Sequence, residues 1–178
     1  MKICGEGILI MNRTRDWKVK RDQPKVRFSG EKDSTQNKLR SQLYSYAYER
    51  LDEANEQGMF FEVIALCDML ITDRLEAYCQ YLLHNDDLQF NTMSTGQAIE
   101  ALEVALKDNA PEVKSSPEWK QLSQKIRAFA NARNTALHSF VLIKNAATNV
   151  SLDERIVFVE VTAEEGNELT REVDRFVK

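Results

Sequence analysis

The chain has 178 residues, of which 43% are hydrophobic and 29% charged, with a net charge of −4. This length suits one domain with a core of its own, and no apolar run approaches the ~18 residues that a membrane helix needs. The three cysteines form no CxxC pair, which speaks against a zinc site or a disulfide scaffold. The apolar run Ile8–Met11 is too short for a signal-peptide core, so we expect a cytoplasmic protein.

The charge is unevenly distributed along the chain. Eleven Lys or Arg and five Asp or Glu fall within the first 40 residues, so this stretch carries +6 and the remainder −10. A basic arm on an acidic body suggests attraction to a polyanion such as RNA. The alternative is a solvated N-terminal segment, and the sequence leaves both open.

The predicted elements begin after this arm. We expect residues 1–32 to be an irregular basic arm, with a short strand at Ile8–Met11 or Val26–Phe28, and residues 33–178 to form a helical domain. Trp17 stands among Arg and Lys residues, where it is expected either to stack on a base or to anchor the arm by packing.

Two helices are predicted next. The first begins at Asp33 or Ser34 and ends near Glu56, where Gly58 is typical of a helix C-terminus. The second runs from Phe60 to about Leu83, with His84 at its end, and its regular apolar face predicts a central packing helix. The expected inward stripes are Leu39, Leu43, Tyr46, Ala47 and Leu51 on the first helix, and Phe60, Ile64, Cys67, Ile71, Leu75, Tyr78 and Leu82 on the second.

Two further helices carry clear start signals. Ser94 begins a capping box for a third helix that ends near Asp108, before Ala110-Pro111. Ser116 as cap and Pro117 in the first helical position begin a fourth helix that extends to about Lys144.

The last segment is predicted to contain the only β structure of the domain. The residues from Arg155 to Val161 are rich in Val, Ile and Phe, so we expect a strand there. Thr162 followed by Ala-Glu-Glu then predicts the start of a short final helix.

The fourth predicted helix carries a charge on its apolar face. At ~100° per residue, Arg133 falls within the stripe, between Phe129 and Phe140. A buried guanidinium has to be paired or hydrogen-bonded, because an unpaired charge costs several kcal/mol. Such a residue indicates an interface or an active site; alternatively, it forms a salt bridge to an acid of the second helix such as Asp68.

Two polar side chains adjoin this arginine. Asn134 and His138 are four residues apart and therefore share one side of the helix, so with Arg133 they are expected to face one cleft. Arginine binds phosphate oxygens bidentately, histidine serves as general acid or base near neutral pH, and RNA supplies its own 2′-hydroxyl nucleophile. No metal ligand set or glycine-rich phosphate loop accompanies them, so we expect no cofactor. In the alternative, His138 is a partly exposed surface residue.

The segment Ala132-Arg-Asn-Thr-Ala-Leu-His-Ser-Phe140 resembles the signature of the HEPN superfamily, an arginine followed by a polar residue and then a histidine after a gap of four to six. The resemblance covers roughly residues 34–145 and implies a bundle of four to five helices that dimerises, bringing two copies of the motif into one composite, metal-independent ribonuclease site. It implies that Arg133 contacts the scissile phosphate, His138 transfers a proton and Asn134 positions the site.

Two functions therefore follow as expectations. The first is a homodimeric endoribonuclease, a toxin or defence effector with an antitoxin or nucleotidyltransferase-like partner. The second is a non-catalytic HEPN module that binds RNA, a nucleotide or a protein. The residues expected to contact RNA beyond the motif are Arg127, Asn131, Lys18 and Lys20.

Overall fold

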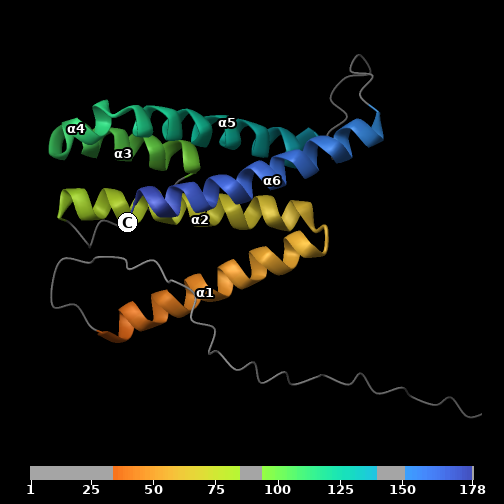
Figure 1. The fold of residues 1–178 in the computed structure, drawn as a ribbon, viewed down its shortest axis with the longest axis horizontal. Coiled ribbons are helices and arrows are strands. Elements are labelled where there is room, and N and C mark those ends of the chain that lie inside the picture. Colours follow the sequence, from red (N-terminus) through yellow and green to blue (C-terminus); the bar gives the residue numbers. More distant parts are fainter. Residues whose placement is uncertain (1–33, 85–93, 140–150, 178) are drawn as a thin grey trace, which may run out of the picture.

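The computed structural model describes residues 34–84, 94–139 and 151–177, and its regular structure there is entirely helical (Figure 1). The predicted arm, Lys18 and Lys20 lie outside these residues, as do Phe140 and the expected continuation of the fourth helix to Lys144. The helices are α1 (Ser34–Glu56), α2 (Phe60–Leu83), α3 (Thr95–Asn109), α4 (Pro111–Ser115), α5 (Pro117–Ser139) and α6 (Leu152–Phe176).

Helix α2 lies at the centre of the bundle, as its apolar face predicts. It packs against α1, α3, α5 and α6, and in Figure 1 it lies beside α6, with α3 and α5 on one side and α1 on the other. The inward residues from Ile64 to Leu75 at three-four spacing are fully buried. This face needs partners on several sides because it is apolar over more than one stripe.

Local sequence signals set most helix boundaries. Gly58 adopts φ +67°, and the N–H of Met59 donates to the Ala54 carbonyl at 2.8 Å, which closes the end of α1. Ser94 and Gln97 form the predicted capping box, and Ser116 accepts the N–H of Trp119 at 3.1 Å. The short helix α4 begins at Pro111, where only a break was predicted.

The predicted strand at Arg155–Val161 is wrong. These residues belong to α6, which a capping box of Ser151 and Glu154 starts four residues earlier. Helical spacing places Val159, Ala163 and Val173 in the core, so packing against α2 and α5 outweighs the β preference of the local sequence. Thr162 begins no new helix; it lies inside α6, where its hydroxyl donates to the Phe158 carbonyl at 2.7 Å.

The inward face of α1 also differs from the prediction. Leu43 and Tyr46 are more than half exposed, whereas Tyr44 and Ala54 are buried together with the predicted Leu51. Tyr44 faces inward, and Cζ of Arg74 on α2 lies 3.8 Å from the centroid of its ring. This cation–π contact favours the inward position of Tyr44.

Candidate functional site

Arg133 lies on α5 at the border of the core, as the apolar stripe predicts. Trp119, Leu122, Ile126 and Phe129 are buried on the same side of the helix, and continuing at four-residue spacing leads to Arg133, whose side chain is 19% exposed. The helix continues unbroken beyond it to Ser139. The position of this charge therefore follows from helix periodicity alone.

The partner of Arg133 is Asp68 on α2. Nη2 of Arg133 lies 3.0 Å from Oδ1 of Asp68, and the same carboxylate oxygen accepts a hydrogen bond from the hydroxyl of Thr95. The Thr95 hydroxyl oxygen lies 2.9 Å from that of Thr72. Helices α2, α3 and α5 thus meet at one carboxylate, which is the salt bridge weighed above as the alternative to a functional arginine.

The guanidinium of Arg133 keeps unused hydrogen-bonding capacity. Its Nε is buried and has no hydrogen-bond partner among the described residues. A buried donor without a partner costs about 1–3 kcal/mol. The contact with Asp68 fixes one edge of the guanidinium while another donor stays unsatisfied.

Asn134 and His138 are both exposed on the last turns of α5. Their four-residue spacing places them on one side of the helix, next to Arg133 in sequence. The three predicted residues are therefore together at one end of α5, but two of them face solvent. The groove that the structure shows elsewhere, at the start of α2, is lined by none of the predicted site residues.

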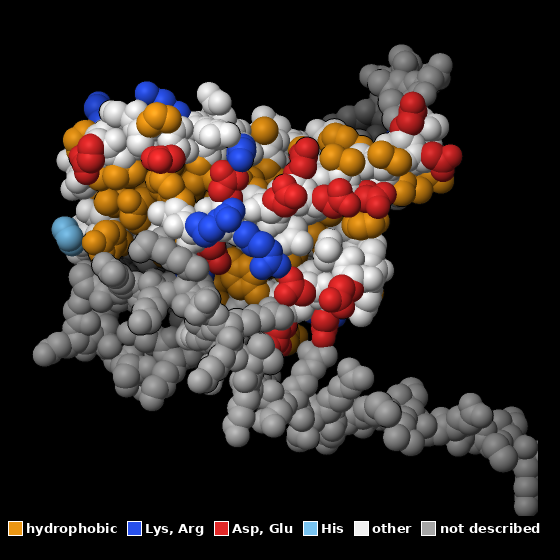
Figure 2. Space-filling model, in the orientation of Figure 1, with side chains coloured by type: hydrophobic (Ala, Val, Ile, Leu, Met, Phe, Trp, Pro, Cys, Tyr) orange, Lys and Arg blue, Asp and Glu red, His pale blue; other side chains and the backbone are white. Residues whose placement is uncertain are grey.

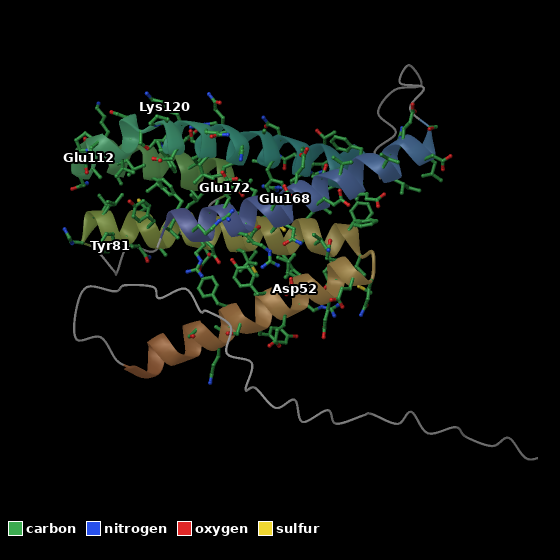
Figure 3. The ribbon with its side chains drawn as sticks, viewed as in Figure 1. Asp52, Tyr81, Glu112, Lys120, Glu168 and Glu172 are labelled. Atoms are coloured by element: carbon green, nitrogen blue, oxygen red, sulfur yellow. The ribbon has the colours of Figure 1, made fainter. Side chains whose placement is uncertain are left out.

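The cations along α5 are largely engaged in ion pairs. Nη2 of Arg127 lies 3.1 Å from Oε2 of Glu103 on α3, and Nζ of Lys125 lies 2.8 Å from Oε2 of Glu172 on α6. Glu172 is labelled in Figure 3. Asn131 is exposed, and its carbonyl accepts the Thr135 hydroxyl at 3.1 Å. Contact with RNA through Arg127 would therefore compete with an existing salt bridge.

The other histidine closes a helix. His84 is exposed at the C-cap of α2 with φ +50°, and its N–H donates back to the last turn. It ends α2, whereas His138 lies in the last turn of a different helix, α5. His84 is therefore a natural control for His138.

A second charge on an apolar stripe, Arg74, was not predicted from the sequence. Arg74 of α2 is buried, with Nε 2.5 Å from Oδ1 of Asp174 on α6, and the hydroxyl of Tyr48 on α1 donates to the same carboxylate. Burial is the larger cause and this hydrogen bond the second cause of a pKa of Tyr48 far above its ordinary value. The sequence contains the same signal as at Arg133, a charged residue within an apolar stripe: Arg74 lies between Ile71 and Leu75 of the apolar face of α2.

The described residues offer neither a metal centre nor a membrane helix. Within residues 34–84, 94–139 and 151–177, no group of three or more His, Cys, Asp or Glu side chains is placed to hold a metal ion. Over the same ranges, no helix has both the length and the apolar character needed to cross a bilayer.

No family model, curated protein or solved structure matches the chain.

Proposed function

We propose that this chain is a metal-independent endoribonuclease of HEPN type, with Arg133 and His138 as catalytic residues and Asn134 as a positioning residue. The observation that carries the proposal is that α5 bears a guanidinium fixed by an ion pair and, five residues later, an exposed histidine. Asp68 orients Arg133 at the edge of the core, while His138 is free to meet a substrate at the surface. A fixed cation and a solvent-facing acid–base group at the same end of one helix suit a phosphodiester whose 2′-hydroxyl attacks the adjacent phosphorus.

The reaction divides between these side chains. His138 accepts the proton of the 2′-hydroxyl or delivers one to the leaving 5′-oxygen, and Arg133 stabilises the charge that develops on the phosphate oxygens. The products are a 2′,3′-cyclic phosphate and a 5′-hydroxyl. Unpaired RNA is the favoured substrate, because an A-form duplex resists the in-line geometry.

A second copy of the chain completes the site in this proposal. Asn134 and His138 lie on an exposed helix surface, which by itself excludes little water from the reaction. A homodimer that places the ends of two α5 helices together supplies the opposite wall and a second acid–base group. We expect sedimentation velocity at micromolar concentration to give a dimer; a strict monomer would argue against a composite site.

The test is cleavage of a single-stranded RNA by the purified full chain in EDTA. We expect His138→Asn to lower the rate ~10²–10⁴-fold and Arg133→Ala ~10²–10³-fold, while the matched variant His84→Asn, prepared in parallel, retains the wild-type rate. Arg133→Lys should remain impaired because it lacks the bidentate fork. A 2′-deoxy substrate should stay intact.

Three results would refute the nuclease. These are a requirement for magnesium, equal cleavage of DNA, and equal rates for His138→Asn and His84→Asn. The last of these would indicate a contaminating ribonuclease.

The second candidate is a non-catalytic HEPN-type binding module. The observation that favours it is the engagement of Arg133 by Asp68 and of Arg127 by Glu103, which gives both arginines a structural role. This candidate predicts that the chain binds RNA or a nucleotide, that Arg133→Ala weakens this binding, and that neither protein forms any cleavage product.

A further inference from the structure

One surface of the bundle is apolar on a helix that is already packed on its other side. The N-terminal half of α6 buries Val159 and Ala163 against the body, yet the large apolar residues around them are 39–64% exposed. A helix that is apolar on both sides is usually buried on both sides. We call this set the α6 apolar surface: Met59, Phe61, Leu152, Ile156, Val157, Phe158 and Val161.

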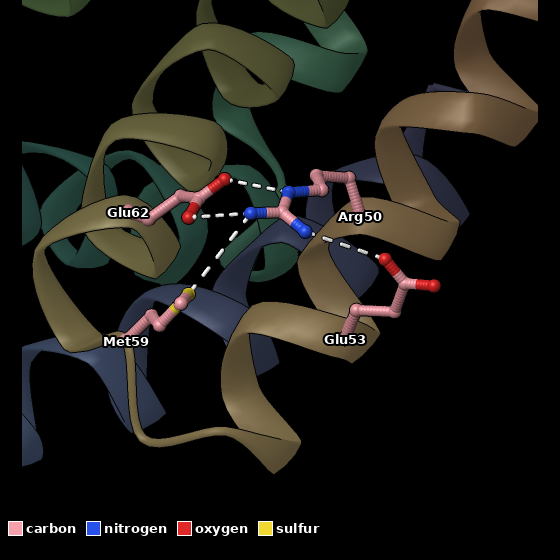
Figure 4. Close-up of polar contacts among 4 residues, drawn as sticks. All are labelled: Arg50, Glu53, Met59 and Glu62. Carbon is pink, nitrogen blue, oxygen red and sulfur yellow. Dashed lines mark hydrogen bonds and ion pairs between the residues drawn. The ribbon is translucent and has the colours of Figure 1, made fainter. Parts of the chain in front are cut away.

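The α6 apolar surface includes a groove of about 340 Å³ between the start of α2 and α6. Met59, Phe61, Glu62 and Ile156 are among the residues that line it. Arg50 of α1 fixes this wall by binding both carboxylate oxygens of Glu62, at 2.7 and 3.0 Å (Figure 4). The groove is small, near the lower limit of the ~300–1,000 Å³ typical of ligand pockets, and suits a few apolar side chains rather than a large cofactor.

The charge around this surface selects its occupant. Residues 152–168 contain six Asp or Glu and one Arg, a net charge of −5, and Figure 2 shows acidic side chains in a row beside the orange apolar patches of α6. Two copies packed through this surface would bring acid against acid, which costs free energy. A segment that is apolar and basic fits instead.

We infer that the α6 apolar surface binds residues 8–21 of the same chain. This segment begins with four apolar residues, Ile8–Met11, and continues with five Lys or Arg and one Asp, a net charge of +4. Trp17 and Val19 add apolar side chains between the bases. Its apolar residues match the groove, and its bases match the acids of α6.

The intervening chain is long enough to reach. The groove lies by the C-terminal end of α1, so the connection has to return along this helix of 23 residues, about 34 Å at 1.5 Å per residue. Residues 22–33 span up to ~40 Å when extended. The inference involves neither Arg133 nor His138, so its test can fail while the cleavage test succeeds, and the reverse.

Photocrosslinking in the full chain tests it. The photoreactive amino acid p-benzoylphenylalanine replaces Phe158, and in a matched control it replaces Val104, an exposed apolar residue of α3. We expect the probe at 158, but not at 104, to crosslink to residues 8–21 within one chain, as mapped by mass spectrometry. Ile10→Glu should lower the yield about tenfold or more, because a carboxylate would be desolvated in the groove.

Hydrogen exchange gives a second readout that needs no probe. Ile10→Glu should speed the exchange of amides in residues 156–161 relative to the wild type, whereas Ile10→Leu should leave it unchanged. Crosslinks that join two chains, crosslinks that miss residues 8–21, or exchange that ignores Ile10→Glu would each overturn the inference. A crosslinked species of twice the chain mass would assign the surface to a second copy.

Discussion

Gly166 lies at the closest approach between α6 and its neighbours, and Gly166→Ala tests the packing there. A Cβ built at this position lies 2.5 Å from Cε2 and 3.0 Å from Cζ of Phe129, and 3.3 Å from the Cβ of Cys67. Carbon atoms pack at about 3.5–4.0 Å, so the Phe129 ring has to move by about 1 Å. Phe129 is 4% exposed, and its surroundings leave little room for this shift.

Two opposing effects set the magnitude. Overpacking a core costs ~1–3 kcal/mol, while replacing Gly by Ala inside a helix gains at most about 1 kcal/mol. Since the contact is far below the normal distance, we expect the upper part of the range to apply. Gly166→Ala should therefore lower the free energy of unfolding by about 1–2 kcal/mol, or Tm by ~2–8 °C for a chain of this size.

Gly96→Ala provides the matched control. Gly96 is also helical, but among the residues that the structure describes, the only neighbour that a Cβ there would meet is Oγ of Ser94, at 3.8 Å. Urea unfolding should show Gly96→Ala to be neutral or stabilising by a few tenths of a kcal/mol to 1 kcal/mol. Phe129→Leu should partly rescue Gly166→Ala, with a coupling free energy of about 1 kcal/mol or more in a double-mutant cycle. If the two Gly→Ala variants behave alike, the close approach of α6 is wrong.

Three further predictions concern titratable groups. Burial raises the pKa of the Cys67 thiol to about 11. In a variant that keeps Cys67 as its sole cysteine, DTNB at pH 8 should therefore react on the order of 10²-fold more slowly with the folded than with the urea-unfolded protein. Equal rates would contradict this. The backbone N–H of Ser151 and then its hydroxyl lower the pKa of Glu154, so its contribution to stability is present above about pH 4.5 and is lost as the pH falls through the lower folded pKa. Glu154→Gln should flatten the decline of Tm between pH 5 and 3 measured by circular dichroism, and an unchanged decline would count against the cap. Burial and the Asp174 hydrogen bond raise the pKa of Tyr48, so its contribution to stability is intact below the ordinary tyrosine pKa of about 10 and falls as the pH rises above it. Tyr48→Phe should therefore reduce the difference between the free energies of unfolding measured in urea at pH 8 and at pH 10.5. No reduction would refute the buried phenol.

The helices that the sequence predicts well are those with both a local start signal and a regular apolar face. Helix α2 has its predicted bounds of Phe60 and Leu83, and α3 begins at its predicted cap. Helix α6 was mispredicted because its local composition and its tertiary role disagree. The run from Ile156 to Val159 favours a strand in isolation. The residues after it have helical spacing, and they form a helix because this spacing allows them to pack on α2, which is distant in sequence.

The sequence predicts the position of the candidate site and, as one of two alternatives, the ion pair between Arg133 and Asp68. Helix periodicity places Arg133 at the edge of the core and Asn134 beside His138. Asp68 could be named only as one example of an acid on the second helix, because the choice of partner depends on how α2 packs on α5, across 65 residues of sequence. The functional roles of Arg133 and His138 therefore stay predictions that the cleavage experiment has to decide.

The buried pair of Arg74 and Asp174 has a consequence for protein synthesis. The two residues are 100 positions apart, so at about 5–20 residues per second the ribosome adds Asp174 roughly 5–20 s after Arg74. During this interval the guanidinium lacks its carboxylate and the apolar face of α2 lacks the helix that covers it. The nascent chain therefore remains prone to aggregation until α6 has emerged, and a chaperone that holds exposed apolar helices would have its greatest effect in that interval.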